Sequence, residues 1–343
     1  MGKLAIPKTG FPLIGWFVDK NTFIICRLTV PLYFLCCKSF LITSFITAVF
    51  SYVGIWKFYR LLNDLYPGNS KAFAYIVLFM PSLIFWGGGI MKDSYMLGAV
   101  CWFSYNFYAV FFSRKKVFWN VVFLVLNTIM ILNCKSYILI SLIPGCLLWL
   151  NSFYLQNIKN KLIRILIFPL IIVAGIVSGG VIFNSFSSSM GVYSSFDSAI
   201  KKAQIIQDDL LREDSYGKNN YELDLIDGTI SGLLSSAPLA IFTALFRPLP
   251  WEIGSPTMVV SAVENTFLLI FVIYSLVRTG PFKFFGIALN DPFLNYCLVF
   301  SLLFAFGVGI AGTNFGALVR YKIPLMPFFF TLIYIVRKKS RSK

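Results

Sequence analysis

Long runs of apolar residues recur along the chain, and each run ends at a charged or polar cluster. A run of about 20 apolar residues is long enough to cross the hydrocarbon core of a bilayer as a helix. Lipid offers no partner to backbone N–H and C=O groups, so such runs are expected to be helical. Hydrophobic residues make up 58% of the chain and charged residues only 13%. The sequence therefore predicts an all-α, polytopic membrane protein, with one integral membrane domain over residues 1–343.

The apolar runs predict about nine to ten transmembrane helices. The nine clearest spans are Ser39–Lys57, Ala72–Ile90, Tyr95–Phe112, Val117–Asn133, Tyr137–Leu150, Leu162–Phe183, Thr266–Leu276, Phe293–Ala311 and Ile323–Val336. A tenth apolar stretch, Thr22–Cys37, is short and contains Arg27 and Pro31, so an interfacial or re-entrant helix is as good an interpretation as a span. Residues 1–38 are accordingly expected to form a membrane-surface or re-entrant segment.

The long polar stretch of the chain, residues 184–264, predicts one extracytoplasmic loop. Apolar residues from Phe196 to Leu210 recur at helical spacing with charges between them, which predicts an amphipathic helix in this loop. Leu233–Phe246 is apolar enough to dip back into the membrane before the chain breaks at Arg247 and Pro248. Glu264 is expected to cap the following helix or to lie at the membrane interface.

Basic residues gather in alternate connections and predict the orientation. The net charge is +16, and placing the tail Arg337–Lys339 in the cytoplasm also brings Arg114–Lys116 there, as the positive-inside rule expects. The same alternation places Lys92–Asp93, Lys135 and Arg320–Lys322 outside. With nine spans the amino terminus lies outside as well. Either an upstream transmembrane helix is missing from this chain, or the stretch before Lys38 spans and the terminus is inside.

Composition excludes several kinds of chemistry. The chain has no histidine, which rules out Ser/His triads, His-ligated metals and histidine acid–base catalysis. Its seven cysteines are scattered through apolar segments without metal-ligand spacing and are expected to be packing residues. The basic charge reflects membrane orientation, so no nucleic-acid partner is expected.

The first polar cluster follows the triple glycine Gly87–Gly89 at the end of a predicted span. Glycine lets the backbone unwind there, and exposed amides beside Lys92 would suit an anion. The alternative is structural: Asp93 or Ser94 caps the next helix, while Lys92 extends to the membrane surface.

The second cluster contains Arg247 and Glu252 around a stretch stiffened by Pro248 and Pro250. Trp251 lies between them and is suited to stack on a sugar or to sit in the interfacial aromatic belt. A rigid turn of this kind would hold an arginine in place for a ligand. It is equally well explained by an Arg247–Glu252 ion pair that fixes the loop.

The third cluster is Arg320-Tyr321-Lys322, preceded by Gly312–Gly316 and followed by Pro324. Two cations so close together are predicted to clamp a diphosphate, with arginine able to bind it bidentately. Anchoring to anionic lipid head groups is the competing interpretation.

The chain resembles polytopic proteins encoded in bacterial surface-polysaccharide clusters. The resemblance rests on Pro81–Trp86 through Lys92-Asp93, on Phe246–Glu252, and on Asn314–Gly316 through Arg320–Lys322, and it thinly covers Pro81–Pro327. It implies a membrane glycosyltransferase of the GT-C type or a repeat-unit polymerase, of the sort that makes O-antigen or capsule. Such enzymes act on polyprenyl-phosphate or diphosphate sugars at the outer face of the bacterial inner membrane. They usually carry an acidic residue in the first external loop, where this chain offers only Asp19.

The leading hypothesis is glycan transfer from a polyprenyl-linked donor to an acceptor hydroxyl. Phosphate charge would be stabilised by basic side chains, the acceptor proton taken by a carboxylate and the sugar supported by an aromatic ring. These groups are Arg320, Lys322, Arg247, Lys92 and Lys135 for phosphate, Asp93 and Glu252 for the proton, and Trp86 and Trp251 for the sugar. No cofactor is expected, although the carboxylates leave a divalent metal open. Other polysaccharide-assembly proteins are expected partners, and a lipid-linked glycan flippase is the alternative function.

Overall fold

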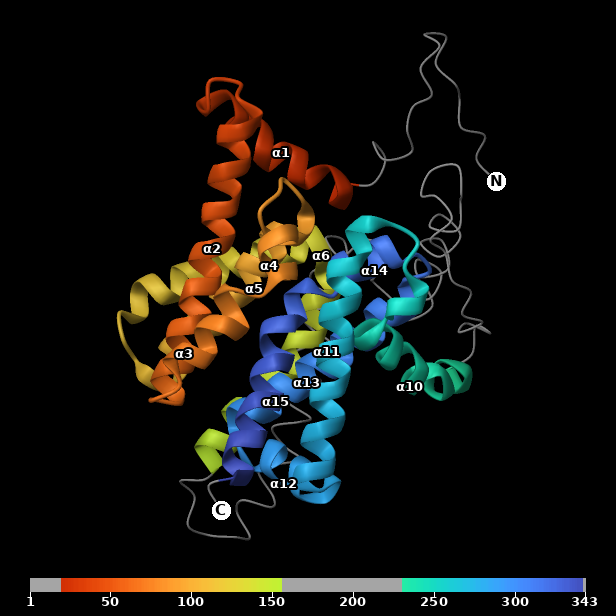
Figure 1. The fold of residues 1–343 in the computed structure, drawn as a ribbon. Coiled ribbons are helices and arrows are strands. Elements are labelled where there is room, and N and C mark those ends of the chain that lie inside the picture. The colour runs from red at the N-terminus through yellow and green to blue at the C-terminus, as the bar shows by residue number, and fades with distance from the viewer. Residues whose placement is uncertain (1–19, 156–229, 342–343) are drawn as a thin grey trace.

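The computed structural model describes residues 20–155 and 230–341, and their secondary-structure elements are helices (Figure 1). The first part contains α1 (Lys20–Leu35), α2 (Phe40–Leu65), α3 (Ser70–Phe73), η2 (Ala74–Leu78), α4 (Pro81–Gly87), α5 (Lys92–Tyr108), η3 (Ala109–Ser113) and α6 (Val117–Leu155). The second contains α10 (Ile230–Phe246), η5 (Pro250–Glu252), α11 (Pro256–Thr279), α12 (Pro281–Asn290), α13 (Pro292–Ala311), α14 (Phe315–Tyr321), η6 (Ile323–Leu325) and α15 (Met326–Arg341). The predicted span Leu162–Phe183, the amphipathic helix at Phe196–Leu210 and the first 19 residues lie outside the described residues.

Six described helices are long and apolar enough to cross a membrane, or seven if one bent pair forms a single span. The helices pack as a bundle, with α11, α13 and α15 together in the C-terminal half and α2 against α5 in the other half (Figure 1). This arrangement fits a multi-pass membrane protein. The count of nine to ten spans stays a prediction.

The predicted spans Val117–Asn133 and Tyr137–Leu150 are the two arms of α6. They meet at Lys135, whose backbone is non-helical with φ −148° and ψ 76°. The charged residue thus marks the break, as the sequence indicated, but the break is a kink rather than a loop.

The predicted span Ala72–Ile90 is a bent pair of helices, which together are long and apolar enough to cross a membrane. The chain forms α3 and η2, bends by 45°, and continues as α4 from Pro81. Proline has no N–H to donate and is favoured in the first turn of a helix, which explains why a new helix starts there.

The C-terminal boundary of the predicted loop, residue 264, lies inside a helix of the structure. Residues 230–246 form α10, and α11 already begins at Pro256, ten residues before the predicted start at Thr266. Glu264 was expected near the helix start and instead lies within α11. The apolar stretch predicted to re-enter the membrane forms α10, which packs against α13. Its re-entry stays a prediction.

Helix α1 is apolar but, at 16 residues, is shorter than the spans. It contacts α2 and α6, and the Thr29 hydroxyl lies 3.3 Å from the Tyr95 hydroxyl on α5. Large side chains such as Phe34 and Leu35 are exposed. These features favour the interfacial or re-entrant alternative for this segment.

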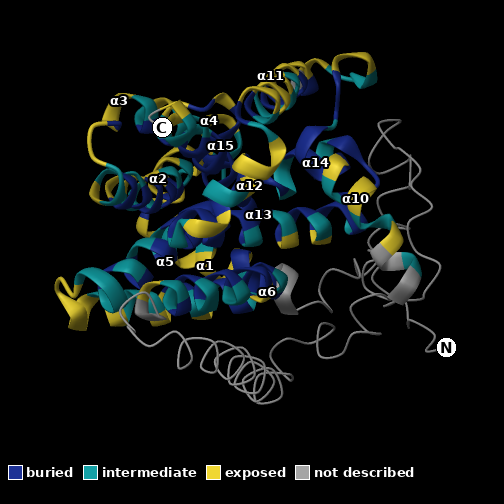
Figure 2. Cartoon of the chain, turned by 90° about the horizontal axis from the view of Figure 1, so that it is seen from below, coloured by how far each residue is buried: buried dark blue, intermediate teal, exposed yellow. Residues whose placement is uncertain are grey.

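Helices α13 and α15 are mostly buried, whereas α2 and α11 expose many of their residues at the rim (Figure 2). Close backbone contacts between small residues join the helices: a Cβ on Gly54 would lie 2.0 Å from the carbonyl oxygen of Gly98, and one on Gly309 would lie 2.0 Å from that of Ala240. Small residues let membrane helices approach in this way. An aromatic core around Tyr296 fills the remaining space between α5, α6 and α13.

The bundle has two ends that matter for function. We call the end that carries Gly87–Gly89, Lys135 and Arg320 the Trp86 end. The opposite end carries Asp291 and the basic tail of α15, and we call it the Lys338 end. Helices α5, α11 and α15 run from the Trp86 end to the Lys338 end, and α13 runs back.

Candidate functional site

The three polar clusters predicted from the sequence meet at the Trp86 end. Contacts join them in space: Arg320 packs over Trp86, Lys135 over Tyr321, and the Lys322 ammonium reaches the carbonyl oxygen of Arg247. The structure therefore brings the three clusters together at one end of the bundle. Which side of a membrane this end faces stays a prediction.

The chain leaves the helical conformation after Gly87 and resumes it at Lys92, so the backbone is unwound over the glycines as expected. The carbonyl oxygen of Trp86 accepts a hydrogen bond of 2.9 Å from the Ser94 hydroxyl. This bond ties the end of α4 to the start of α5. The broken backbone is therefore held in a defined position beside Trp86.

Asp93 and Lys135 form a buried ion pair, with 2.5 Å between Oδ1 and Nζ. Asp93 lies in the first turn of α5, where the helix dipole favours a carboxylate. Lys135 comes from the kink of α6, and its ammonium lies 4.4 Å from the centre of the Tyr321 ring. Buried charges persist only when they are paired, so this pair fixes α5, α6 and α14 against one another.

Arg320 occupies the last turn of α14 and is half-buried. Its Nε–H donates to the Gly316 carbonyl oxygen at 3.0 Å, and its guanidinium carbon lies 5.9 Å from the centre of the Trp86 ring. Asn314 caps this short helix by accepting from the backbone N–H of Gly316 at 2.8 Å. The cap and the aromatic ring hold a guanidinium whose terminal N–H groups remain suited to binding an oxyanion.

Lys322 has a different environment from Arg320. Its side chain is only 3% exposed, and its ammonium donates to the carbonyl oxygens of Leu245 at 3.2 Å and Arg247 at 3.3 Å and to Asn265 Oδ1 at 2.6 Å. Carbonyls at the end of a helix lack partners within the helix, and Lys322 satisfies them for α10. An ammonium has three N–H donors, all of them used here. Of the two cations predicted to clamp a diphosphate, Lys322 has no donor left for a ligand, and Arg320 remains the candidate.

Arg247 and Glu252 form the ion pair named as the structural alternative. Arg247 Nε lies 2.7 Å from Glu252 Oε1, and the other carboxylate oxygen accepts from the Leu249 N–H at 2.8 Å. The guanidinium also lies 5.1 Å from the centre of the Phe315 ring. Both Glu252 oxygens are thus occupied in fixing the turn.

The remaining predicted residues lie around this centre. Trp251 is 78% exposed, whereas Trp86 is partly buried and packs against Arg320. Lys92 is partly exposed at the first position of α5. Trp86 is therefore the better placed of the two aromatic candidates. No cluster of potential metal ligands occurs among the residues that the structure describes.

Glu264 is the residue whose role the sequence did not predict. Glu264 is 9% exposed and lies two turns into α11, so it cannot cap the start of that helix. It caps the start of α4 instead. Its oxygens accept from the Ser82 N–H at 3.0 Å and the Ser82 hydroxyl at 2.6 Å. An acidic residue inside an apolar run was the available signal, because such residues are costly in a membrane unless they have partners.

All seven cysteines are free, and five of them are buried, as expected of packing residues; Cys26 and Cys37 are exposed.

Comparison with known proteins found no matching family model, no similar curated protein and no similar solved structure.

Proposed function

We propose that the protein is a membrane glycosyltransferase or repeat-unit polymerase. Its substrate would be a glycan linked to a polyprenyl phosphate or diphosphate, and its acceptor a hydroxyl group of a growing surface polysaccharide. The observation that carries the proposal is the half-buried Arg320 guanidinium stacked on Trp86, at the meeting point of the three polar clusters. A cation and an aromatic ring side by side suit the two parts of such a donor, its phosphate and its sugar.

The proposed reaction breaks the bond between the anomeric carbon of the sugar and the oxygen of the lipid phosphate. The electron pair of this bond leaves with the phosphate, whose growing negative charge Arg320 would stabilise. The acceptor oxygen forms the new bond to the anomeric carbon and gives its proton to Asp93. Lys135 would hold the Asp93 carboxylate in place through their ion pair.

A flippase that moves a lipid-linked glycan without chemistry is the second candidate. Broken helices are common in transporters, and this chain bends by 45° before α4 and kinks at Lys135. The candidate site nevertheless lies at one end of the bundle. Transport would call for cations along a path to both ends.

The test is the profile of lipid-linked glycans in cells that carry the wild type, a deletion, Arg320→Ala or the control Lys283→Ala. Lys283 is exposed on α12 at the Lys338 end, away from the site. Loss of one preorganised charge-stabilising group costs about 10²–10³-fold in rate. Arg320→Ala should therefore abolish polymer and accumulate unextended lipid-linked units on the outer leaflet, as in the deletion, while Lys283→Ala behaves as wild type.

Two outcomes would contradict the proposal. Accumulation confined to the cytoplasmic leaflet would identify a flippase. Normal polymer amount and length in Arg320→Ala, with protein levels intact, would remove the role of Arg320.

A further inference from the structure

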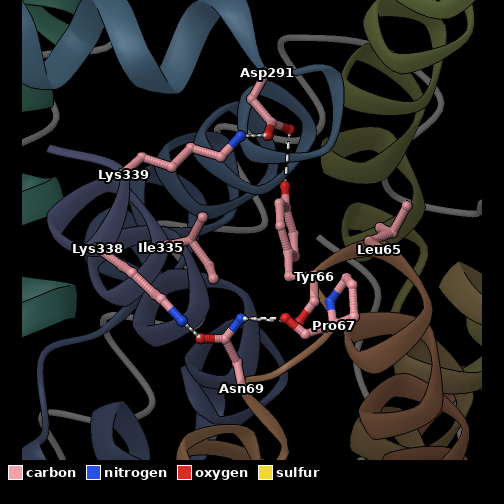
Figure 3. A pocket seen from close by; sticks show the side chains of 8 residues that line it. All are labelled: Leu65, Tyr66, Pro67, Asn69, Asp291, Ile335, Lys338 and Lys339. Atoms are coloured by element: carbon pink, nitrogen blue, oxygen red, sulfur yellow. Dashed lines mark hydrogen bonds and ion pairs between the residues drawn. The ribbon is translucent and has the colours of Figure 1, made fainter. Parts of the chain in front are cut away.

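A pocket of about 450 Å³ opens at the Lys338 end, remote from the candidate site. It lies between the connection from α2 to α3, the start of α13 and the end of α15. Side chains from all three line it: Tyr66 and Asn69 from the connection, Asp291 from the cap of α13, and Lys338 and Lys339 from α15 (Figure 3).

The carboxylate in this pocket is fully engaged. Asp291 Oδ1 accepts from the backbone N–H groups of Phe293 at 3.0 Å and Leu294 at 3.1 Å and from the Tyr66 hydroxyl at 2.8 Å, while Oδ2 pairs with Lys339. Burial, followed by the nearby Asp291 charge, raises the pKa of Tyr66 well above its ordinary value, so Tyr66 remains a neutral donor. The negative charge of Asp291 is thus balanced by Lys339 and by the start of α13.

Lys338, unlike Asp291, contacts a neutral partner. Its ammonium donates to Asn69 Oδ1, a neutral amide oxygen that also accepts from the Tyr334 hydroxyl at 3.3 Å. Asn69 is held in turn by its own donation to the Tyr66 carbonyl oxygen at 2.9 Å. Among the described residues, no carboxylate forms an ion pair with Lys338. An ammonium has three donors, so Lys338 presents both positive charge and N–H groups to the pocket.

We propose that this pocket binds a phosphate group through Lys338, carried either by an anionic membrane lipid or by a soluble phosphate compound. Lysine is a common phosphate ligand that acts as a compact point charge. The pocket lies where apolar helices end and basic residues of α15 gather, and basic pockets in this position bind lipid head groups. The inference is independent of the transferase proposal, because the two sites lie at opposite ends of the bundle.

The test uses the full chain purified in detergent, as wild type, Lys338→Gln, Lys338→Arg and Lys283→Gln. Native mass spectrometry measures binding of short-chain phosphatidylglycerol, short-chain phosphatidylcholine and inorganic phosphate. Loss of one surface charge weakens attraction to an anionic head group by about 1 kcal/mol, or about fivefold. We expect a loss of at least about tenfold in Lys338→Gln, because a specific contact adds to that general attraction. Lys283→Gln should lose fivefold or less, and Lys338→Arg should bind.

Each binding measurement either supports or overturns the proposal. Binding of phosphatidylglycerol but not inorganic phosphate supports a lipid ligand, and binding of inorganic phosphate supports a soluble one. Absence of binding to either anion overturns the proposal. Equal losses in Lys338→Gln and Lys283→Gln, or equal binding of phosphatidylcholine, also overturn it. Thermal unfolding of Lys338→Gln shows whether the variant is folded, and Lys338→Arg tests the charge without removing the side chain.

Discussion

Arg320 and Lys322 are neighbours in the sequence with opposite surroundings. Arg320 is half-buried against the face of Trp86, whereas Lys322 is enclosed by oxygen acceptors from α10 and α11. The first suits a ligand and the second holds helices together. Arg320 lies in the last turn of α14 and Lys322 is its C-cap, two residues on, so the helical turn directs the two side chains to nearly opposite sides.

This difference predicts distinct effects of the two alanine variants. Lys322→Ala leaves the carbonyls of Leu245 and Arg247 and the amide of Asn265 without their donor, and an unsatisfied buried polar group costs about 1–3 kcal/mol. Lys322→Ala should therefore lower the unfolding temperature and the amount of folded protein, whereas Arg320→Ala should change neither. Fluorescence-detected size-exclusion chromatography after heating measures both. A Lys322→Ala protein as stable as wild type that makes no polymer would restore Lys322 as a phosphate ligand.

The residue types at the site were predictable, but their partners were not. Charges beside broken backbone pointed to Asp93, Lys135 and Arg320, and the structure brings all three to one end of the bundle. The role of Glu264 escaped because its partner, Ser82, is 182 residues away in the chain. A local sequence pattern contains no information about such a distant contact. It therefore led to the prediction that Glu264 caps the helix in which it lies.

At the scale of elements, apolar runs and charges located most helices but not their interruptions. Lys135 was correctly predicted to separate two segments, which are the arms of α6. Pro81 was missed as a break because hydropathy continues unchanged through it, although its missing N–H ends one hydrogen-bonding pattern and begins another. The start of α11 was missed because Glu264 looked like a boundary, while its charge is accommodated inside the bundle by Ser82.

The contact between α10 and α13 gives a prediction at this scale. A methyl group on Gly309 would meet the Ala240 carbonyl oxygen at 2.0 Å, so Gly309→Ala must separate the helices. Overpacking of this kind costs about 1–3 kcal/mol. Gly307→Ala is the matched control, because nothing lies within 4 Å of its added methyl in the same helix. Gly309→Ala should lower the unfolding temperature in detergent and Gly307→Ala should not; equal temperatures would contradict the close contact.

At the scale of the whole molecule, the periphery is apolar along α2 and α11. The exposed large side chains there include Phe40, Leu41, Phe45 and Val49 on α2 and Val263, Phe267, Ile270 and Val277 on α11. A lipid-facing surface explains this exposure, because lipid tails are as apolar as the side chains. That the protein belongs in a membrane was predictable from composition, because this property depends on the sum of many apolar residues rather than on any one contact.

Orientation is testable with cysteine labelling. After the exposed Cys26 and Cys37 are replaced by serine, Trp251→Cys reports the Trp86 end and Lys283→Cys the Lys338 end. The positive-inside rule predicts that a membrane-impermeant maleimide labels Trp251→Cys in intact spheroplasts, and Lys283→Cys only after permeabilisation. The reverse pattern would place the candidate site in the cytoplasm and exclude an outer-face transferase.

The buried pair of Asp93 and Lys135 also bears on how the chain is made. Lys135 is synthesised 42 residues after Asp93. At roughly 5–20 residues per second, Asp93 spends about 2 to 8 s without its partner. Glu264, by contrast, is synthesised after its donor Ser82. Lys322 is likewise synthesised after its acceptor Asn265. Each of these two charged residues therefore finds its partner already made. Membrane insertion should therefore be vulnerable while α5 waits for α6, and a ribosome pausing between them would expose the chain to quality-control proteases at that step.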